Sequence, residues 1–167
     1  SGETVEHVLM GKDDSCVLLA SDAGYGFICQ FNDLVSRNKN GKAIITLPTG
    51  AKILPPTQVN SIENDRVIAV SNEGRMLVFP VADLPQLSKG KGNKIINIPA
   101  LRAQSREEYV VALATAAPDK AVTLMAGKRK LTLKPADLEH YLGERGRRGN
   151  KLPRGLQRVD DIIVEDE

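Results

Sequence analysis

Loops rich in lysine, arginine and glycine hold the side chains of this sequence that are best suited to chemistry. The most regular one reads Lys89-Gly-Lys-Gly-Asn-Lys94 and leads into the apolar run Ile95-Ile-Asn-Ile98. Ammonium groups supply positive charge, and glycine lets backbone N–H groups approach a ligand closely, so such a loop suits a phosphate. A solvated turn has the same composition, and repetition along the chain is what favours phosphate binding.

The junction of a basic loop and a following segment occurs three times. The first basic loop is Asn38–Lys42, the second is Lys89–Lys94 and the third is Gly143–Lys151. The predicted phosphate contacts in these loops are Lys39 and Lys42, then Lys89, Lys91 and Lys94, then Arg145, Arg147, Arg148 and Lys151. A separate cationic edge consists of Lys128, Arg129 and Lys130, where strand alternation sends Arg129 to the face opposite its two neighbours.

Charge is distributed unevenly along the chain, although the net value is only +2. Residues 1–86 hold seven Lys/Arg against ten Asp/Glu, residues 87–158 hold sixteen against six, and residues 159–167 hold none against five. The basic stretch predicts a surface that faces a polyanion, and the acidic end is its counterweight. Lys39 and Lys42 are the weaker candidates because the first part of the chain is net acidic.

The sequence disfavours several classes of protein. No apolar run approaches the roughly 20 residues that a membrane-spanning helix needs, and no signal peptide is expected. Cys16 and Cys29 lack the spacing of a metal site and are expected to be reduced thiols. We therefore expect no metal and no cofactor in this domain. The opening Ser1-Gly2 resembles a tag scar, which suggests an excised piece of a longer protein.

Three similar units account for most of the chain. Each begins with a hairpin around a glycine turn, and the turn glycines are Gly24, Gly74 and Gly127. Each hairpin is followed by an Asp-Leu pair, at 33–34, 83–84 and 137–138, so that landmarks recur at intervals of 50 to 57 residues. The predicted units are approximately 15–60, 65–115 and 120–165, and residues 3–10 resemble the last strand of a preceding unit.

About four short strands per unit indicate an all-β, propeller-like fold, because one small sheet cannot bury both faces alone. We expect about three four-stranded blades that form an open arc or part of a larger disc. The apolar runs after the basic loops are expected to be strands. The predicted helical turns are Pro135–Leu142 and Leu101–Glu108, and the charges of the second segment suggest an exposed excursion.

Several stretches resemble the C-terminal domain of bacterial type IIA topoisomerase A subunits. The stretches are 84–98, 143–149 and 154–159, together with Phe79-Pro80 and Ala82-Asp83-Leu84. The likeness covers nearly the whole chain and is strongest to the topoisomerase IV branch. It implies a β-pinwheel, in which propeller-like blades exchange a strand with their neighbours, and an outer rim that binds and bends duplex DNA.

The resemblance also implies a role and a context. The chain would be a non-catalytic module that steers DNA substrate choice in decatenation and supercoil relaxation. Its parent would be an ATP-dependent bacterial topoisomerase in the cytoplasm, associated with the nucleoid. That parent would form an A2B2 assembly with the ATPase B subunit, and other domains or subunits would use ATP and Mg. No membrane and no small-molecule substrate are expected for this domain.

Catalytic motifs are not recognisable in the sequence. Tyr25, Tyr109 and Tyr141 each lack the neighbouring arginine of a DNA-cleaving tyrosine in this family. There is no Gly-x-x-x-x-Gly-Lys-(Ser/Thr) nucleotide loop and no recognisable Ser/His/Asp set. A propeller enzyme with a site in a central channel is therefore disfavoured.

Two other functions stay open. A gyrase-type domain wraps DNA through a Gln-Arg-Arg-Gly-Gly-Lys-Gly box, and this chain has no intact copy of that box. A protein-binding propeller would use its basic loops only for solubility, which the charge bias of residues 87–158 disfavours. With 4% aromatic residues and no tryptophan, stacking on single-stranded bases is not favoured. We therefore predict binding of the duplex backbone.

Overall fold

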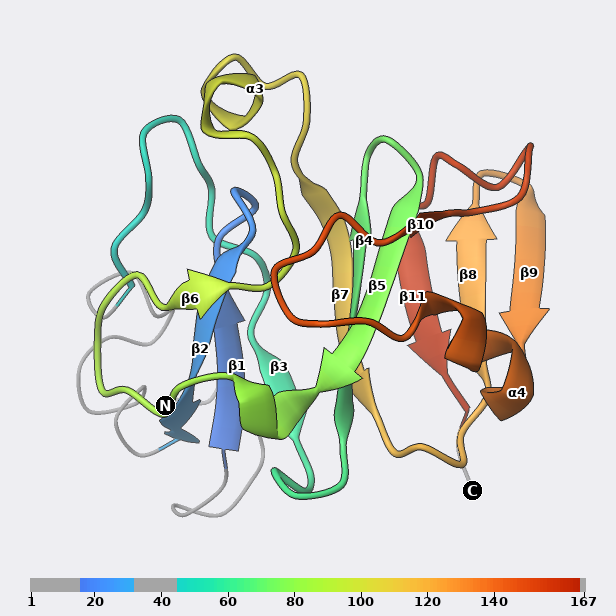
Figure 1. Cartoon of the computed structure of the whole chain (residues 1–167), viewed down its shortest axis with the longest axis horizontal. Helices are drawn as coiled ribbons and strands as arrows, with labels where there is room; N and C mark the ends of the chain where they lie inside the picture. The colour runs from blue at the N-terminus through green and yellow to red at the C-terminus, as the bar shows by residue number, and fades with distance from the viewer. Residues whose placement is uncertain (1–15, 32–44, 166–167) are drawn as a thin grey trace, which may run out of the picture.

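Antiparallel β-strands make up most of the computed structural model, which describes residues 16–31 and 45–165. The strands form three small sheets that stand side by side (Figure 1). The expected all-β, propeller-like fold is confirmed. The predicted strand at residues 3–10, the Asp33-Leu34 pair and the first basic loop lie outside the described residues.

Within residues 16–31 and 45–165, two sheets have four strands and the third has three. In spatial order, the first sheet holds β3 (Thr57–Val59), β1 (Cys16–Ala20), β2 (Tyr25–Gln30) and β6 (Asn93–Lys94). The second sheet holds β10 (Asn150–Lys151), β5 (Arg75–Pro80), β4 (Arg66–Ser71) and β7 (Val110–Ala116). The third sheet holds β11 (Asp161–Val164), β8 (Val122–Ala126) and β9 (Arg129–Leu133).

Each sheet is built on one hairpin that turns at a glycine. The turn glycines Gly24, Gly74 and Gly127 have φ values of +92°, +78° and +64°, a region that residues with a Cβ rarely adopt. The first two hairpins share one register, since Ala20 pairs with Gly26 and Val70 with Met76. The third hairpin has a shorter turn, across which Ala126 pairs with Arg129. The glycines that predict the repeat therefore mark the same backbone reversal in each sheet.

The outer strand of two sheets comes from the following repeat. β6 pairs with β2 of the first sheet, and β10 pairs with β5 of the second. Both exchanged strands follow a glycine that touches the strand of the neighbouring sheet. A Cβ on Gly92 would overlap the carbonyl oxygen of Gly26, and a Cβ on Gly149 would lie 2.5 Å from that of Met76. Glycine at positions 92 and 149 therefore allows β6 and β10 to approach the sheets with which they pair.

The apolar run after the second basic loop differs from its prediction. We expected Ile95–Ile98 to form a strand, but the strand is the polar pair Asn93–Lys94 just before it. Ile95, Ile96 and Ile98 are buried instead and belong to the core that joins the first and second sheets. Their side chains fill the space between two sheets, and this burial requires no ladder of backbone hydrogen bonds.

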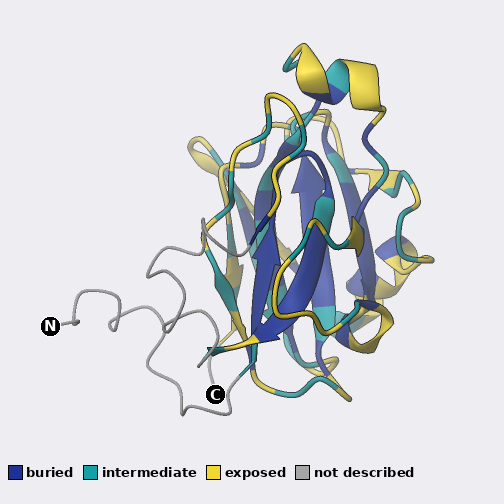
Figure 2. Cartoon of the chain, turned by 90° about the vertical axis from the view of Figure 1, so that its left-hand side faces the viewer, coloured by how far each residue is buried: buried dark blue, intermediate teal, exposed yellow. Residues whose placement is uncertain are grey.

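Two large clusters of apolar side chains hold the sheets together, and the central strands β1, β2, β4 and β5 are buried over most of their length (Figure 2). The first cluster lies between the first and second sheets and includes Leu18, Ile28 and Phe79. The second lies between the second and third sheets and includes Ile68, Met76 and Leu124. The long strand β7 alternates between buried and half-buried residues and contacts both clusters, since Ala112 and Ala116 belong to the second and the half-buried Leu113 packs against the first.

The helical segments with both ends inside the described residues are short. They are η1 (Val81–Asp83), α3 (Ala100–Gln104), α4 (Pro135–Leu138) and η2 (Glu139–Tyr141). The predicted helical turn at Pro135–Leu142 is confirmed, and the one at Leu101–Glu108 is helical only as far as Gln104. The leucines of two Asp-Leu pairs, Leu84 and Leu138, are buried at the ends of η1 and α4. None of the helices in the described parts of the chain could span a membrane.

No disulfide joins Cys16 and Cys29, which are half-buried and buried respectively. Cys29 pairs with Val17 in the hairpin, so Cys16 and Cys29 point to opposite faces of the sheet. This register explains why two cysteines on adjacent strands do not form a disulfide.

Substitution of Gly149 by alanine tests the strand exchange, and Gly127 is its matched control. Both residues have positive φ, but a Cβ on Gly127 would meet nothing within 4 Å. We expect Gly127→Ala to lower the free energy of unfolding by about 1 kcal/mol through backbone strain alone. Gly149→Ala should lower it by about 2–4 kcal/mol, because the overlap adds to the strain. Urea denaturation measures both free energies of unfolding. Equal losses in the two variants would contradict the role of the Gly149 contact in the strand exchange.

Candidate nucleic-acid interface

The predicted cations that lie within the described residues follow the outer edges of three successive sheets. The second basic loop leads into β6 on the first sheet, and the third leads into β10 on the second sheet. Lys128, Arg129 and Lys130 lie at or next to the start of β9, the outer strand of the third sheet in the described chain. Strand exchange thus places the second and third basic loops at the outer edges of the first and second sheets, and the hairpin strand β9 places Lys128–Lys130 at the outer edge of the third (Figure 1).

The second basic loop combines exposed charge with local anchoring. Lys89 is exposed. Lys91 is also exposed, and its Nζ lies 4.4 Å from the centroid of the Tyr25 ring, a cation–π contact with the first sheet. The Nζ of Lys94 donates a hydrogen bond of 2.8 Å to the side-chain oxygen of Asn97. The contact with Tyr25 and the hydrogen bond with Asn97 restrict the side chains of Lys91 and Lys94. Neither partner is a carboxylate, so the positive charges are not neutralised.

The third basic loop holds its arginines in different ways. Arg145 is half-buried and donates from Nη1 to the carbonyl of Lys94 over 2.8 Å. Arg147 is exposed and pairs with Glu144, 2.6 Å away on the same loop. An exposed pair of this kind is weak, so a phosphate can replace the carboxylate. Lys151 is exposed in β10.

The second and third basic loops are hydrogen-bonded to each other at their ends. The amide of Gly146 donates to the carbonyl of Ile95 over 3.0 Å, and the amide of Asn97 donates to the carbonyl of Arg147 over 2.9 Å. The Arg145 contact with Lys94 lies beside them. We call residues 89–97 and 143–151 together the paired basic loops. They form one surface, because neither segment can move without breaking bonds to the other.

Arg148 differs from the other predicted phosphate contacts in the described chain because its guanidinium pairs with a buried carboxylate. Its Nη1 lies 2.8 Å from the carboxylate of Glu108 and donates to the carbonyl of Asn97 over 2.9 Å. The side chain of Glu108 is only 1% exposed. Sequence reasoning placed residues 101–108 in an exposed excursion, and for Glu108 that prediction is wrong, since the acidic side chain turns inward to two arginines.

Arg102 is the second partner of Glu108. Its Nε lies 3.1 Å from that carboxylate, while its two Nη atoms reach Glu107 and Glu73. The hydrogen bond with Glu108 raises the pKa of Arg102 above its ordinary value, and the nearby carboxylates act in the same direction. Arg102 therefore stays charged, and the buried Glu108 has two cationic partners.

Arg106 connects residues 101–108 to the first sheet. Its guanidinium donates two hydrogen bonds to the buried Asp22, at 2.9 and 3.1 Å, and one to the carbonyl of Gly50. The hydrogen bonds with Asp22 raise the pKa of Arg106. Arg106 also has a φ of +63° and stacks on the Tyr109 ring. An arginine in this strained backbone region is stabilised by its contacts.

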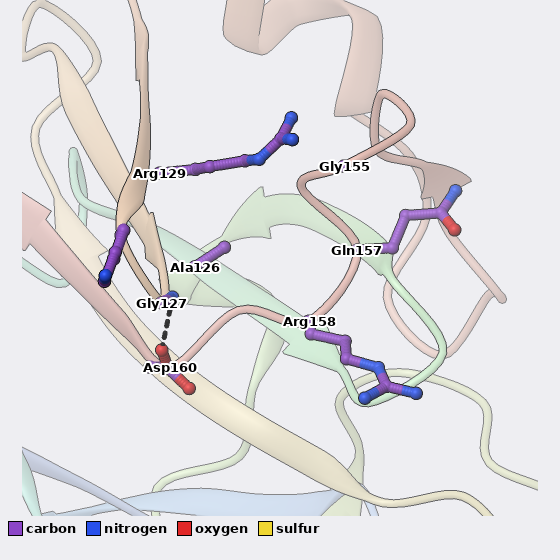
Figure 3. Close-up of a pocket in the computed structure, with 8 residues that line it drawn as sticks. Ala126, Gly127, Arg129, Gly155, Gln157, Arg158 and Asp160 are labelled. Atoms are coloured by element: carbon purple, nitrogen blue, oxygen red, sulfur yellow. Dashed lines mark hydrogen bonds between the residues drawn. The ribbon is translucent and has the colours of Figure 1, made fainter.

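The edge of the third sheet forms an open pocket of about 620 Å³ (Figure 3). The β8–β9 turn lines one side and the segment from Gly155 to Asp160 lines the other. The amide of Gly127 donates to the carboxylate of Asp160 over 2.7 Å and closes the base of the turn. Arg129 extends toward Gly155, whose missing side chain leaves room for the guanidinium.

Sequence reasoning missed Arg158, which is exposed and lines this pocket with Lys128 and Arg129. Its signal was available in the run Arg154-Gly-Leu-Gln-Arg158, which was used only for the family resemblance. Sequence reasoning also missed Tyr25 and Glu108, which act on the basic loops from other parts of the chain. Within the described residues, no group of three or more acidic, histidine or cysteine side chains is arranged to hold a metal ion.

Comparison with known proteins agrees with this geometry. The family described as DNA gyrase C-terminal domain, beta-propeller, matches residues 17–60 and 65–115. The chain belongs to this family.

The similarity is closer to one branch of the family. The chain is 55% identical over 164 residues to the A subunit of DNA topoisomerase 4 from Pseudomonas aeruginosa. That match covers 98% of the chain and 22% of the relative, so the chain spans about a fifth of the length of the curated relatives it matches. The matching family model and a similar solved structure are both described as C-terminal domains, so the chain corresponds to the C-terminal domain of a topoisomerase IV A subunit, as the resemblance predicted.

Solved structures give the same result. The C-terminal domain of Escherichia coli ParC matches with a TM-score of 0.83 and 50% identity, over 94% of this chain and 63% of that one. A gyrase A C-terminal domain matches with a TM-score of 0.70 and 16% identity, over 93% of this chain and 50% of that one. The second likeness shows the fold alone.

Arg148 and Lys89 offer a test of the different roles within the basic loops. We expect Arg148→Ala to lower the free energy of unfolding by about 1–3 kcal/mol, because it leaves a buried carboxylate with one partner fewer. Lys89→Ala should change it by less than about 0.5 kcal/mol, since the side chain is exposed. Urea denaturation at neutral pH compares the two variants. Equal stability would show that the buried pair contributes nothing.

Proposed function

We propose that this domain binds duplex DNA along its outer rim and bends it, and that it steers DNA substrate choice in a topoisomerase IV. The observation that carries the proposal is the pairing of the second and third basic loops across two successive sheets. This pairing supports a continuous cationic surface in a domain of the gyrase C-terminal family. The phosphate contacts proposed here are Lys89, Lys91, Lys94, Arg145, Arg147 and Lys151, with Lys128, Arg129 and Lys130 further along the rim.

The chemistry of these side chains favours the backbone over the bases. Lysine ammonium groups and exposed guanidinium groups neutralise phosphates and release counterions whatever the sequence. Contacts of this kind position a duplex without reading it. Arg148 is left out of the set because its guanidinium is bound to Glu108. Lys39 and Lys42 stay predictions, since they lie outside the described residues.

A curved rim would favour bent DNA. The outer strands β6, β10 and β9 belong to three different sheets that share packed cores, so their relative positions are fixed. Bending a site of 20–30 base pairs costs on the order of 1–6 kcal/mol, and contacts at successive sheets would offset this cost. The duplex would follow the rim because a straight duplex would reach fewer of the cations.

The role in the parent enzyme rests on the relatives. We propose that the longer protein is the A subunit of an ATP-dependent topoisomerase, which works with an ATPase B subunit in the bacterial cytoplasm. Decatenation and supercoil relaxation would be its reactions, and this domain would select DNA for them without taking part in cleavage. The degenerate basic loops disfavour tight gyrase-type wrapping.

Removal of two exposed cations tests DNA binding. We expect Lys89→Ala combined with Lys91→Ala to weaken binding of a 40-base-pair duplex and to reduce the slope of log K against log salt by about 1.8, the value for two phosphate contacts. The matched control is Lys52→Ala combined with Lys120→Ala, which removes the same charge from residues outside the basic loops. Fluorescence anisotropy between 50 and 200 mM salt measures both. Equal effects of the two pairs would contradict a rim site.

The same change in the full-length protein tests the role in substrate choice. Lys89→Ala combined with Lys91→Ala should slow decatenation or relaxation of DNA while the cleavage of a short duplex continues at the normal rate. The physical reason is that only long or crossed DNA can reach both the rim and the cleavage site. Reconstituted enzyme is assayed on linked circles, supercoiled plasmid and a short duplex. An equal loss in all three assays would contradict a steering role.

A further inference from the structure

Glu108 occupies an unusual position for an acidic residue in a basic surface. It is buried, with 1% of its side chain exposed, and it contacts the third basic loop from the inside. One of its oxygens binds Nη1 of Arg148 at 2.8 Å and the other binds Nε of Arg102 at 3.1 Å. A buried carboxylate with two cationic partners is stable only while both partners keep their positions.

The contacts of Arg148 extend from Glu108 to the paired basic loops. The same Nη1 atom donates to the carbonyl of Asn97 at the end of the second loop. The amide of Asn97 in turn donates to the carbonyl of Arg147 in the third loop. Arg148 thus joins the buried carboxylate to both loops at the point where they are hydrogen-bonded together.

The excursion that carries Glu108 is itself fixed. Arg102 reaches Glu73 in the β4–β5 turn, and Asn72 in the same turn accepts from the amide of Tyr109 and donates to the carbonyl of Glu107. Arg106 binds Asp22 of the first sheet. Contacts with two sheets therefore hold Glu108 in place, and it provides a fixed point for a loop that consists largely of glycine and arginine.

We infer that Glu108 is the positioning residue of the DNA-binding surface, and that its carboxylate acts through Arg148 to keep the paired basic loops in their phosphate-binding arrangement. This inference rests on the proposed function of those loops. Glu108 itself contacts no DNA, because it is buried. Its charge is opposite to the charge expected to help DNA binding, and this sign makes the inference testable.

Replacement of Glu108 by glutamine separates two effects on DNA affinity. Loss of the negative charge and loss of the positioning contact are expected to change the affinity in opposite directions. Glu108→Gln removes one negative charge near the rim, so electrostatic attraction alone would tighten DNA binding. Loss of the positioning contact would weaken it, because two arginines would be left next to each other without the carboxylate and the loops would separate. We expect at least a threefold loss of duplex affinity and a salt slope shallower by about one to two, which corresponds to one or two lost phosphate contacts.

The matched control is Glu107→Gln. Glu107 precedes Glu108, pairs with the same Arg102 at 3.1 Å and is 60% exposed, so its replacement changes the charge equally without touching Arg148. We expect Glu107→Gln to bind duplex DNA as tightly as the unaltered protein or more tightly, with an unchanged salt slope. If Glu108→Gln binds as tightly as Glu107→Gln, the inference is wrong.

Hydrogen exchange separates positioning from general instability. In Glu108→Gln the amides of Gly146 and Asn97, which connect the two loops, should exchange faster, while the amide of Ile68 in β4 keeps its protection. If the glutamine variant does not fold, Glu108→Asp replaces it, and this variant keeps the charge but withdraws the carboxylate by one methylene. Weaker binding with loop-specific exchange is expected for it, and binding equal to that of Glu107→Gln would again overturn the inference.

The outcome also distinguishes this inference from the proposed function. Lys89→Ala combined with Lys91→Ala is measured in the same titration. If that pair leaves duplex binding unchanged, the loops do not bind DNA and the proposed function fails. If that pair weakens binding while Glu108→Gln does not, the proposed function holds and only the positioning role fails.

Discussion

Close contact between backbones at two glycines is the constraint on which the rest of the structure depends. Gly92 lies against the carbonyl of Gly26, and Gly149 lies against that of Met76, so each exchanged strand can reach the open edge of the preceding sheet. An uncovered edge would leave backbone N–H and C=O groups unpaired. The segment that covers the edge is the end of a basic loop. The same residues therefore complete a sheet and carry positive charge to the rim, so folding and charge placement depend on each other.

A cationic rim needs nearby carboxylates that reduce the repulsion between its lysines and arginines. Bringing the second and third basic loops together places several lysines and arginines near one another, and their mutual repulsion opposes the pairing. Glu108 counters this repulsion from the interior, where burial weakens solvent screening and strengthens its ion pair with Arg148. Charges on the exposed side, such as the pair of Arg147 with Glu144, are screened and easily exchanged. Buried ion pairs therefore hold the inner side of the surface in place. On the outer side, exposed side chains could exchange a carboxylate partner for a phosphate.

The parts of this structure that could be predicted from the sequence are the local ones. The positive φ of Gly24, Gly74 and Gly127 follows from hairpin chemistry that repeats along the chain. Two features depend on contacts between distant segments and could not be predicted from local patterns. Ile95 and Ile96 have the composition of a strand, but they fill a space between sheets that only the folded chain creates. The charged run 106–108 has the composition of an exposed loop, but Arg148, forty residues later, provides the partner that makes burial of Glu108 favourable.

Rigid support also has a consequence for how such a surface would act on DNA. A flexible basic loop loses conformational freedom when it binds, and this loss reduces the affinity that each contact provides. Loops that are already hydrogen-bonded to each other and tied to a buried carboxylate lose little, so more of each phosphate contact remains to offset bending of the duplex. A surface organised in this way would change the path of DNA without reading its sequence. In the proposed function, the shape of the rim would decide which duplex fits, and no set of base contacts would be needed.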